Sequence, residues 1–272
     1  MTNTTTHRAE EFRRLHEPGR LLRLPNAWDA GSARVIEACG AAAIATTSAG
    51  LAWSRGYRDG GALPTHVLAG AVAEIARVLS VPLTVDVEDG YAEDPRVVGD
   101  TVSVVVKAGA VGINIEDGED SPDLLCRKIA AVKEATHRTG GDPFVNVRTD
   151  VYLRNLVPAD RAVPETIERA RRYRTAGADG LFVPGLVDAT AIRAIVAAIG
   201  LPLNVMIIPG LPPVAELQSL GVRRVSAGQT ITQAAYAVTR RAATRFLENG
   251  LYDTMLETTI GYGELNGLFP NA

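Results

Sequence analysis

Eight short apolar runs alternate with eight longer amphipathic stretches in this chain of 272 residues, and this alternation constrains the fold more than any other feature. We expect the runs to be strands at 21–25, 42–46, 82–86, 112–116, 144–148, 180–183, 203–206 and 224–226. The stretches between them have helical spacing, at 30–38, 65–79, 94–108, 122–139, 164–176, 188–199, 213–220 and 229–247. Strands that alternate with helices form parallel sheets, and eight such pairs favour an α/β fold closed into a (β/α)8 TIM barrel.

The chain length fits one barrel, because α/β barrels of this size form a single domain around one core. No linker or low-complexity segment divides the sequence, so residues 1–272 are expected to form one domain. Residues 248–272 follow the last predicted barrel helix and still carry apolar side chains. We therefore expect a C-terminal helical tail that packs against its own barrel or against a neighbour.

Composition and charge exclude several classes of partner. The net charge is −3 and the pI is about 5.9, whereas nucleic acids and anionic membranes attract basic patches. No apolar run approaches the roughly 20 residues that span a bilayer, and the polar start MTNTTTHRAEEF lacks the apolar core of a signal peptide. These features predict a cytoplasmic protein without a nucleic-acid or membrane partner. Cys39 and Cys126 are expected to be ordinary thiols, since two cysteines make neither a disulfide framework nor a zinc site.

Lysine and histidine are scarce, and this scarcity limits the available chemistry. All three lysines fall in predicted helices, where none is well placed to form the Schiff base of an aldolase: Lys107, Lys128 and Lys133. The histidines lie in the N-terminal segment or in or next to predicted helices, which disfavours a histidine-ligated metal or a histidine base: His7, His16, His66 and His137. Carboxylates, arginine, hydroxyl groups and backbone amides remain as catalytic groups.

Acidic side chains follow the carboxyl ends of neighbouring predicted strands, where barrels place their active sites. Asp86 and Glu88 come at the end of one strand, and Glu116 ends the next. Side chains two apart on a strand share a face, so Asp86 and Glu88 are expected to point the same way. Three carboxylates at one barrel mouth repel each other, and a divalent cation offsets that cost. Ligands that are all oxygen favour Mg²⁺ or Mn²⁺, although helix N-caps are an alternative role for these acids.

The next strand brings an arginine to the same end of the barrel. Asn114 shares a face with Glu116, and Asn146 shares a face with Arg148, by the same two-residue spacing. A buried arginine needs an anion, and a substrate carboxylate fits its planar fork. Pairing of Arg148 with a neighbouring acid is the alternative.

The turn Ser48-Ala49-Gly50 follows the second predicted strand. Its small side chains and free amides suit the binding of a carboxylate or a developing oxyanion. A plain, tight connection from strand to helix would have the same sequence. Other nearby acids have equally plain alternatives as helix caps or turn residues: Asp29, Asp59, Asp89 and Asp117.

Several segments taken together resemble the isocitrate lyase/phosphoenolpyruvate mutase superfamily. They are LPNAWDAGSARVIEACGAAAIATTSAGLAWSRGYRDG, VDVEDGYAEDP, GINIEDG, VNVRTDVYL, AGADGLFVPG and PLNVM, and they follow in this order from about Leu24 to Ser226. The resemblance implies a barrel that binds magnesium and a 2-oxo carboxylate such as pyruvate, oxaloacetate or phosphonopyruvate. It also implies a homotetramer or dimer in which C-terminal helices are exchanged between barrels.

The resemblance also implies roles for single residues, motif by motif. Asp86 resembles the direct metal ligand, and Glu88 and Glu116 resemble ligands that act mainly through bound water. Asp59 resembles a further member of this acidic shell. The implied substrate-binding residues are Ser48, Ala49, Gly50, Arg148 and Asn204. Of all these, the expected catalytic residues are Ser48, Asp59 and Arg148.

The loop after Glu116 departs from the best-known members. Isocitrate and methylisocitrate lyases carry Lys-Lys/Arg-Cys-Gly-His there, and its cysteine acts as an acid. This chain instead has DGEDSPDLLCRK, which places Cys126 in the following predicted helix. Mutases and phosphonopyruvate hydrolases have a longer gating loop, whereas a short lid admits water.

We therefore expect a magnesium-dependent lyase or decarboxylase that breaks a carbon–carbon bond in a small 2-oxo acid through a metal-stabilised enolate. The first alternative is carbon–phosphorus chemistry, as in a phosphonomutase or a phosphonopyruvate hydrolase. A barrel that binds 2-oxo acids without catalysis is a second alternative, and an unrelated Schiff-base aldolase is a third.

Overall fold

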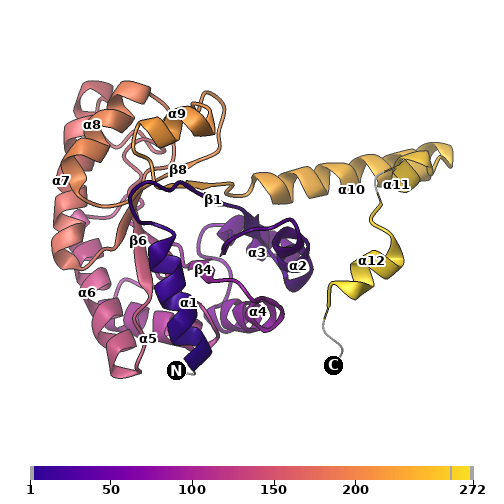
Figure 1. Cartoon of the computed structure of the whole chain (residues 1–272), viewed down its shortest axis with the longest axis horizontal. Helices are drawn as coiled ribbons and strands as arrows, with labels where there is room; N and C mark the ends of the chain where they lie inside the picture. Colours follow the sequence, from indigo (N-terminus) through magenta and orange to yellow (C-terminus); the bar gives the residue numbers. More distant parts are fainter. Residues whose placement is uncertain (1–2, 258, 270–272) are drawn as a thin grey trace.

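The computed structural model describes residues 3–257 and 259–269 and shows a (β/α)8 barrel of parallel strands surrounded by helices (Figure 1). All eight predicted strands are present, which confirms the predicted fold class. The strands are β1 (Leu22–Leu24), β2 (Asn26–Ala27), β3 (Ile44–Thr46), β4 (Leu83–Asp86), β5 (Gly112–Glu116), β6 (Phe144–Arg148), β7 (Gly180–Phe182), β8 (Leu203–Met206) and β9 (Arg224–Ser226). Their order in the sheet is β1-β9-β8-β7-β6-β5-β4-β3-β2.

One predicted strand, 21–25, is divided into β1 and β2 at Pro25. Proline has no N–H to donate to a sheet, but its carbonyl still accepts the amide of Ala45 at 3.0 Å. β1 pairs with β9, and β2 pairs with β3. The two halves of one interrupted strand therefore join both ends of the sheet and close the barrel.

The eight predicted helices are all present, with ends that differ from the predicted ones by two residues at most. They are α2 (Ala30–Ala38), α4 (Thr65–Val78), α5 (Pro95–Lys107), α6 (Pro122–Arg138), α7 (Ala162–Ala176), α8 (Ala189–Ile199), α9 (Val214–Ser219) and α10 (Thr230–Asn249). Asp29 caps α2, and its carboxylate accepts the amide of Ser32 at 2.6 Å. Two further helices were not predicted, α1 (Asn3–Arg14) and α3 (Ser48–Ser54), while α11 (Asp253–Glu257) and α12 (Tyr262–Gly267) lie in the segment for which a helical tail was expected.

Helix α5 illustrates how the outer layer is held on the barrel. Its buried residues Val98, Val102, Val105 and Val106 recur at helical spacing and form one apolar face. On another side, Gly99 allows α6 to approach closely, because a β-carbon at that position would lie 2.8 Å from the Ala131 carbonyl oxygen. Close packing of this kind fixes the strand ends on which the site is built.

Helix α1 closes the amino-terminal end of the barrel, although its polar sequence gave no sign of this role. Phe12 is fully buried, and its ring meets the ring of Phe144 edge-on at 5.6 Å. His16, just beyond the helix, stacks on the ring of Phe144 at 4.2 Å and also meets the ring of Phe12 at 4.8 Å. One buried aromatic side chain in an otherwise polar helix is therefore enough to seal this end.

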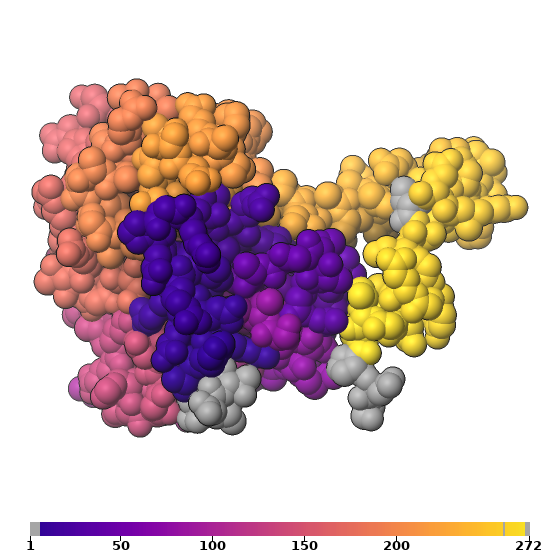
Figure 2. Space-filling model, viewed as in Figure 1, coloured from indigo at the N-terminus to yellow at the C-terminus, as the bar shows by residue number. Residues whose placement is uncertain are grey.

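Helix α10 leaves the barrel and projects into solvent with α11 and α12 (Figures 1 and 2). Its apolar residues stay exposed, including Phe246 at 51% and Leu247 at 80%. The chain then returns toward α2, where Arg34 Nε donates to the Leu268 carbonyl at 2.7 Å. Residues 258 and 270–272 of the predicted tail lie outside the described part. In that part, no helix is both long and apolar enough to cross a membrane.

Candidate active site

A cavity of about 280 Å³ lies at the carboxyl ends of the strands. The lining includes the charged residues Asp59, Asp86 and Arg148 together with apolar side chains. The lining residues are Asn26, Thr47, Ser48, Ala49, Trp53, Asp59, Asp86, Asn114, Arg148, Leu153, Phe182, Pro184, Met206, Ser226, Gly228, Gln229 and Gln233. Arg148 is the single lysine, arginine or histidine among these described residues.

Asp86 is the last residue of β4 and carries the deepest carboxylate of the cavity. Its own amide donates to Thr46 Oγ1 at 2.9 Å, and the amide of Ser48 approaches its Oδ2 at 3.4 Å. Burial raises the pKa of Asp86, and the positive charge of Arg148 only partly opposes that effect. This carboxylate is therefore poised to gain from a nearby cation.

Glu88 lies beyond the end of β4, so the shared strand face predicted for Asp86 and Glu88 is wrong. Its φ of 51° is in the left-handed region, which a residue with a side chain adopts at a cost. The carboxylate accepts the hydroxyl of Tyr91 at 2.9 Å and the amide of Gly61, which ties down the loop that carries Asp59. Burial raises the pKa of Glu88, and the charges of Asp86 and Asp59 add to that effect.

Glu116 and Arg148 end two paired strands and lie opposite each other in the register. Arg148 Nη1 lies 2.7 Å from Glu116 Oε2, and its Nε and Nη2 donate to Asp150 at 2.6 and 2.9 Å. The alternative of pairing with a neighbouring acid is therefore observed. Burial raises the pKa of Glu116 to about 8; the arginine opposes this effect, while Asp86 and Asp150 add to it.

The predicted turn Ser48-Ala49-Gly50 is the first turn of helix α3. Ser48 and Ala49 line the cavity, whereas Gly50 packs behind them. A β-carbon on Gly50 would lie 2.8 Å from atoms of Trp28, Thr47 and Thr232, so only glycine fits. The close packing explains the glycine, and the two residues before it offer their amides to the cavity.

Asn204 lies one layer below the cavity, and Asn114 stands between the two levels. Asn146 Nδ2 donates to Asn114 Oδ1 at 2.9 Å and to Asn204 Oδ1 at 3.1 Å. Asn204 Nδ2 in turn donates to Ser226 Oγ at 3.2 Å. The geometry thus gives Asn204 a supporting position under the floor, and its predicted contact with substrate stays a prediction.

Comparison with known proteins decides the family. The model of the phosphoenolpyruvate phosphomutase family matches residues 12–247, which is most of the chain and all of the cavity. The chain belongs to this family. The resemblance to the isocitrate lyase/phosphoenolpyruvate mutase superfamily is thereby confirmed.

Relatives in the phosphoenolpyruvate phosphomutase family extend over nearly the whole chain. An uncharacterized protein of Mycobacterium tuberculosis is 38% identical over 93% of this chain and 94% of its own length. The solved structure of a candidate phosphonomutase from Burkholderia cenocepacia is 40% identical, has a TM-score of 0.83 and covers 88% of this chain and 99% of that chain. The structure of 2,3-dimethylmalate lyase is 25% identical, with a TM-score of 0.83 and coverage of 97% and 94%. Proteins similar to this chain thus include lyases, decarboxylases and phosphonomutases.

The acidic residues fit a hard divalent cation by their chemistry. In the described part of the chain, no three His, Cys, Asp or Glu side chains converge closely enough to hold a metal ion together. Asp86 lines the cavity, whereas Glu88 and Glu116 stand behind it with protein donors of their own. The pKa of each of the three is raised, first by burial and, for Glu88 and Glu116, also by the neighbouring acids. The arrangement is compatible with Asp86 as a direct metal ligand and with Glu88 and Glu116 as ligands that act through bound water.

Two acids that organise the site were not among the predicted site residues. Asp150 is fully buried and receives Arg148 in a bidentate pair, so it sets the direction of the guanidinium. Asp117 accepts the hydroxyl of Tyr173 at 2.6 Å, the hydroxyl of Thr149 at 2.8 Å and the amide of Asp150 at 2.9 Å. Asp117 therefore has a structural role, in line with the alternative that this acid is not a site residue. The sequence VRTD places Asp150 two residues after Arg148, but this spacing alone does not indicate the bidentate pair.

Proposed function

We propose that this chain is a magnesium-dependent carbon–carbon lyase that acts on a small 2-oxo carboxylic acid by way of an enolate. One observation carries the proposal: Asp86 and Arg148 face the same small cavity at the strand ends, where oxygen ligands and a single guanidinium meet. Asp86 would hold the ion directly, and Glu88 and Glu116 would hold it through water. When bound, magnesium or manganese supplies the Lewis acidity that stabilises the enolate charge.

The chain's own groups would bind and orient the substrate. An arginine has five N–H donors, and three bonds tie Arg148 to Glu116 and Asp150, which leaves two N–H groups for a substrate carboxylate. The amides of Ser48 and Ala49 would hold a second oxygen. Protonation of the enolate carbon would come from water or from Asp59, which also lines the cavity.

The apolar part of the lining favours carbon–carbon over carbon–phosphorus cleavage. These side chains would help to cover the carbon to be protonated: Trp53, Leu153, Phe182, Pro184 and Met206. A phosphonate next to a carboxylate brings more negative charge than one already paired guanidinium offsets. The loop between β5 and α6 spans only residues 117–121, which is a short lid. The similar Burkholderia structure is named as a candidate phosphonomutase, so carbon–phosphorus chemistry is tested as the alternative.

An NMR activity screen tests the reaction. Proton and phosphorus spectra would follow oxaloacetate, phosphonopyruvate, phosphoenolpyruvate and C4-substituted malates with Mg²⁺. We expect turnover of a 2-oxo or 2-hydroxy dicarboxylate with no change in the phosphorus spectra. Conversion of phosphonopyruvate would instead establish the alternative. Metal-dependent binding of oxalate without any turnover would indicate a binding barrel, and trapping of substrate by borohydride would indicate a Schiff base.

Titration with magnesium tests the metal ligand. The Asp86→Ala variant should lose more than about 100-fold in Mg²⁺ affinity, because it removes the direct ligand. Asp120→Asn is a matched control, since this exposed acid belongs to the loop that follows β5. Equal Mg²⁺ affinity of Asp86→Ala and the parent protein would rule out the proposed site.

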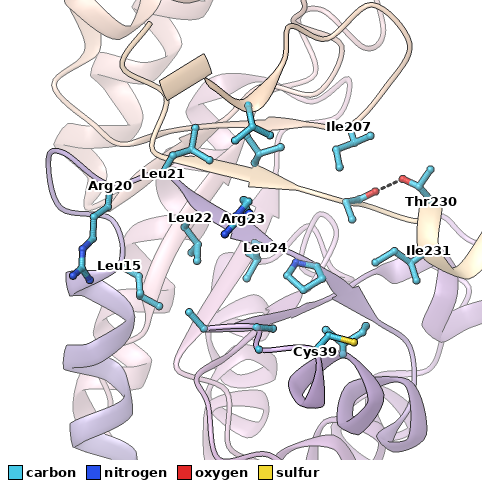
Figure 3. Close-up of a pocket in the computed structure, with 18 of the residues that line it drawn as sticks. Leu15, Arg20, Leu21, Leu22, Arg23, Leu24, Cys39, Ile207, Thr230 and Ile231 are labelled. Carbon is cyan, nitrogen blue, oxygen red and sulfur yellow. Dashed lines mark hydrogen bonds between the residues drawn. The ribbon is translucent and has the colours of Figure 1, made fainter. Parts of the chain in front are cut away.

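We also propose that the chain assembles with copies of itself by exchange of α10. A groove of about 1180 Å³ runs along β1 and β9 on the outside of the barrel (Figure 3). Its lining includes Leu21, Leu24, Ile36, Ile207 and Ile231, and Figure 3 shows leucines of the β1 segment along it. In a (β/α)8 barrel this position belongs to the eighth helix.

The helix that should cover this groove is α10, which points away from it (Figure 1). Among its described residues only Thr232 is buried, so its apolar positions are left without a barrel to cover. Exposed apolar surface of this extent is typical of a protein–protein interface. The α10 of a second copy has the length and apolar character to fill the groove, and exchange in both directions would satisfy both barrels.

A further inference from the structure

Arg224 is a fully buried arginine inside the barrel that the proposed reaction does not use. It is the first residue of β9 and is 1% exposed. Nη2 donates to Asn114 Oδ1 at 3.2 Å, across the interior from β9 to β5. Within the described part of the chain, Nε and Nη1 of Arg224 have no hydrogen-bond partner. A buried guanidinium without a counter-ion is costly, so its place under the cavity calls for a function.

The position of Arg224 determines how Asn114 faces the cavity. Asn114 Oδ1 accepts two bonds, from Asn146 Nδ2 and from Arg224 Nη2. A guanidinium can only donate, so the atom that faces it must be the carbonyl oxygen. The amide group of this planar side chain then points away from Arg224. Since Asn114 lines the cavity floor, its N–H groups become donors for a bound ligand.

The charge of Arg224 also acts on the acidic side of the site. Asp86 is the acid that stabilises the charged form of Arg224, while burial lowers the pKa of Arg224 to about 9. The buried guanidinium therefore produces a positive electrostatic potential at the cavity floor near Asn114, and the low dielectric of the interior screens it only weakly. A substrate whose anionic oxygens rest on the floor would gain from that potential.

We infer that Arg224 is a positioning residue, which fixes the Asn114 amide as a donor to the anionic oxygens of the bound 2-oxo acid and supports their charge from below. The inference rests on the proposed function, because it takes the ligand to be a small carboxylate. Oxalate is a suitable probe, since it is a small planar dianion with the oxygens of such an acid.

Calorimetric titration of oxalate in the presence of Mg²⁺ tests the inference without a turnover assay. We expect Arg224→Met to weaken oxalate binding by about tenfold or more, because the Asn114 amide loses its anchor. Arg224→Lys keeps the charge and should recover part of the affinity. Arg13→Met is a control for stability alone, since Arg13 pairs with Asp179 and Asp142 away from the cavity. It should lower the melting temperature and leave oxalate affinity unchanged.

A double-mutant cycle tests whether Arg224 acts through Asn114. In an Asn114→Ala background, Arg224→Met should weaken binding by much less than tenfold. Independent effects would overturn the positioning role, and so would a folded Arg224→Met protein that binds oxalate as the parent does. If Arg224→Met does not fold, Arg224→Lys and Asn114→Ala still decide, because unchanged affinity in both contradicts the inference. Failure of the parent protein to bind oxalate with Mg²⁺ would instead remove the proposed function and this inference together.

Discussion

The cavity at the strand ends and the groove along β1 and β9 differ in size and in chemistry. The cavity at the strand ends measures about 280 Å³ and brings together carboxylates, amides and one arginine. The groove on the outside of the barrel measures about 1180 Å³ and is lined mainly by aliphatic side chains from β1, α2 and the start of α10. The cavity at the strand ends combines carboxylates with a guanidinium, whereas the lining of the groove contains no carboxylate among the described residues.

This difference shows that the volume of a hollow does not identify an active site. Shifted pKa values cluster at functional sites, and the pKa is raised both for Asp86, which lines the small cavity, and for Glu116 behind it. In the proposed exchange of α10, the groove is the place that the helix of a second copy would fill. We therefore expect substitutions in the cavity to change catalysis and substitutions at the groove or on α10 to change assembly.

The largest effect is expected at Arg148. Arg148→Met should lower kcat/KM by about 100- to 1000-fold, because it removes the one cation that lines the cavity. Arg154→Met is the matched control: it bonds the same Asp150 at 2.9 Å, but its side chain is 44% exposed. The control should stay within about threefold of the parent protein. Equal losses in the two variants would show that Arg148 acts only as part of the Asp150 ion-pair network.

A second prediction concerns assembly. Phe246→Glu places a charge on the exposed apolar face of α10 and should shift the protein from a dimer or tetramer toward monomers. Val104→Glu is its control, because Val104 on α5 is exposed to the same extent, 51%, and lies far from the groove lining. Analytical ultracentrifugation would measure both. A parent protein that sediments as a monomer would contradict the exchange of α10.

Pattern alone predicts the barrel, because each strand and helix here follows its own apolar periodicity. It also predicts that Glu116 and Arg148 come to the same end of the barrel, and the observed register of their strands places them in contact. Where the backbone is regular, the sequence therefore locates side chains well.

Prediction fails where the backbone leaves regular geometry. Glu88 has a left-handed φ, so strand alternation no longer applies to it. Asp150 gains its role only from the direction in which Arg148 folds back, which spacing does not reveal. Helix α1 is missed because its single buried ring, Phe12, leaves no periodic pattern. Each of these features depends on tertiary contacts that local sequence does not encode.

The smallest predicted effect lies where the groove meets the closed end of the barrel. Leu15 lines the groove, while the next residue, His16, is buried against Phe144. Burial and the charge of Arg224 lower the pKa of His16 to about 3, so His16 is neutral in the folded chain. The unfolded chain binds a proton near pH 6.5, so this contribution to stability is complete above pH 6.5 and is lost as the pH falls toward 3. Between pH 6.5 and 5 the loss amounts to about 2 kcal/mol.

His16→Gln removes this titration and keeps an amide that can donate to the Phe12 carbonyl, as the ring nitrogen does at 2.8 Å. Urea unfolding from pH 7 to pH 5 should therefore show a shallower fall in stability for His16→Gln than for the parent protein. The exposed His137 provides the control variant, His137→Gln, whose curve should follow that of the parent. Parallel curves for His16→Gln and the parent would show that protonation of His16 does not oppose folding. The segment that carries Leu15 would then be held at the groove by the aromatic contacts alone, without a neutral histidine.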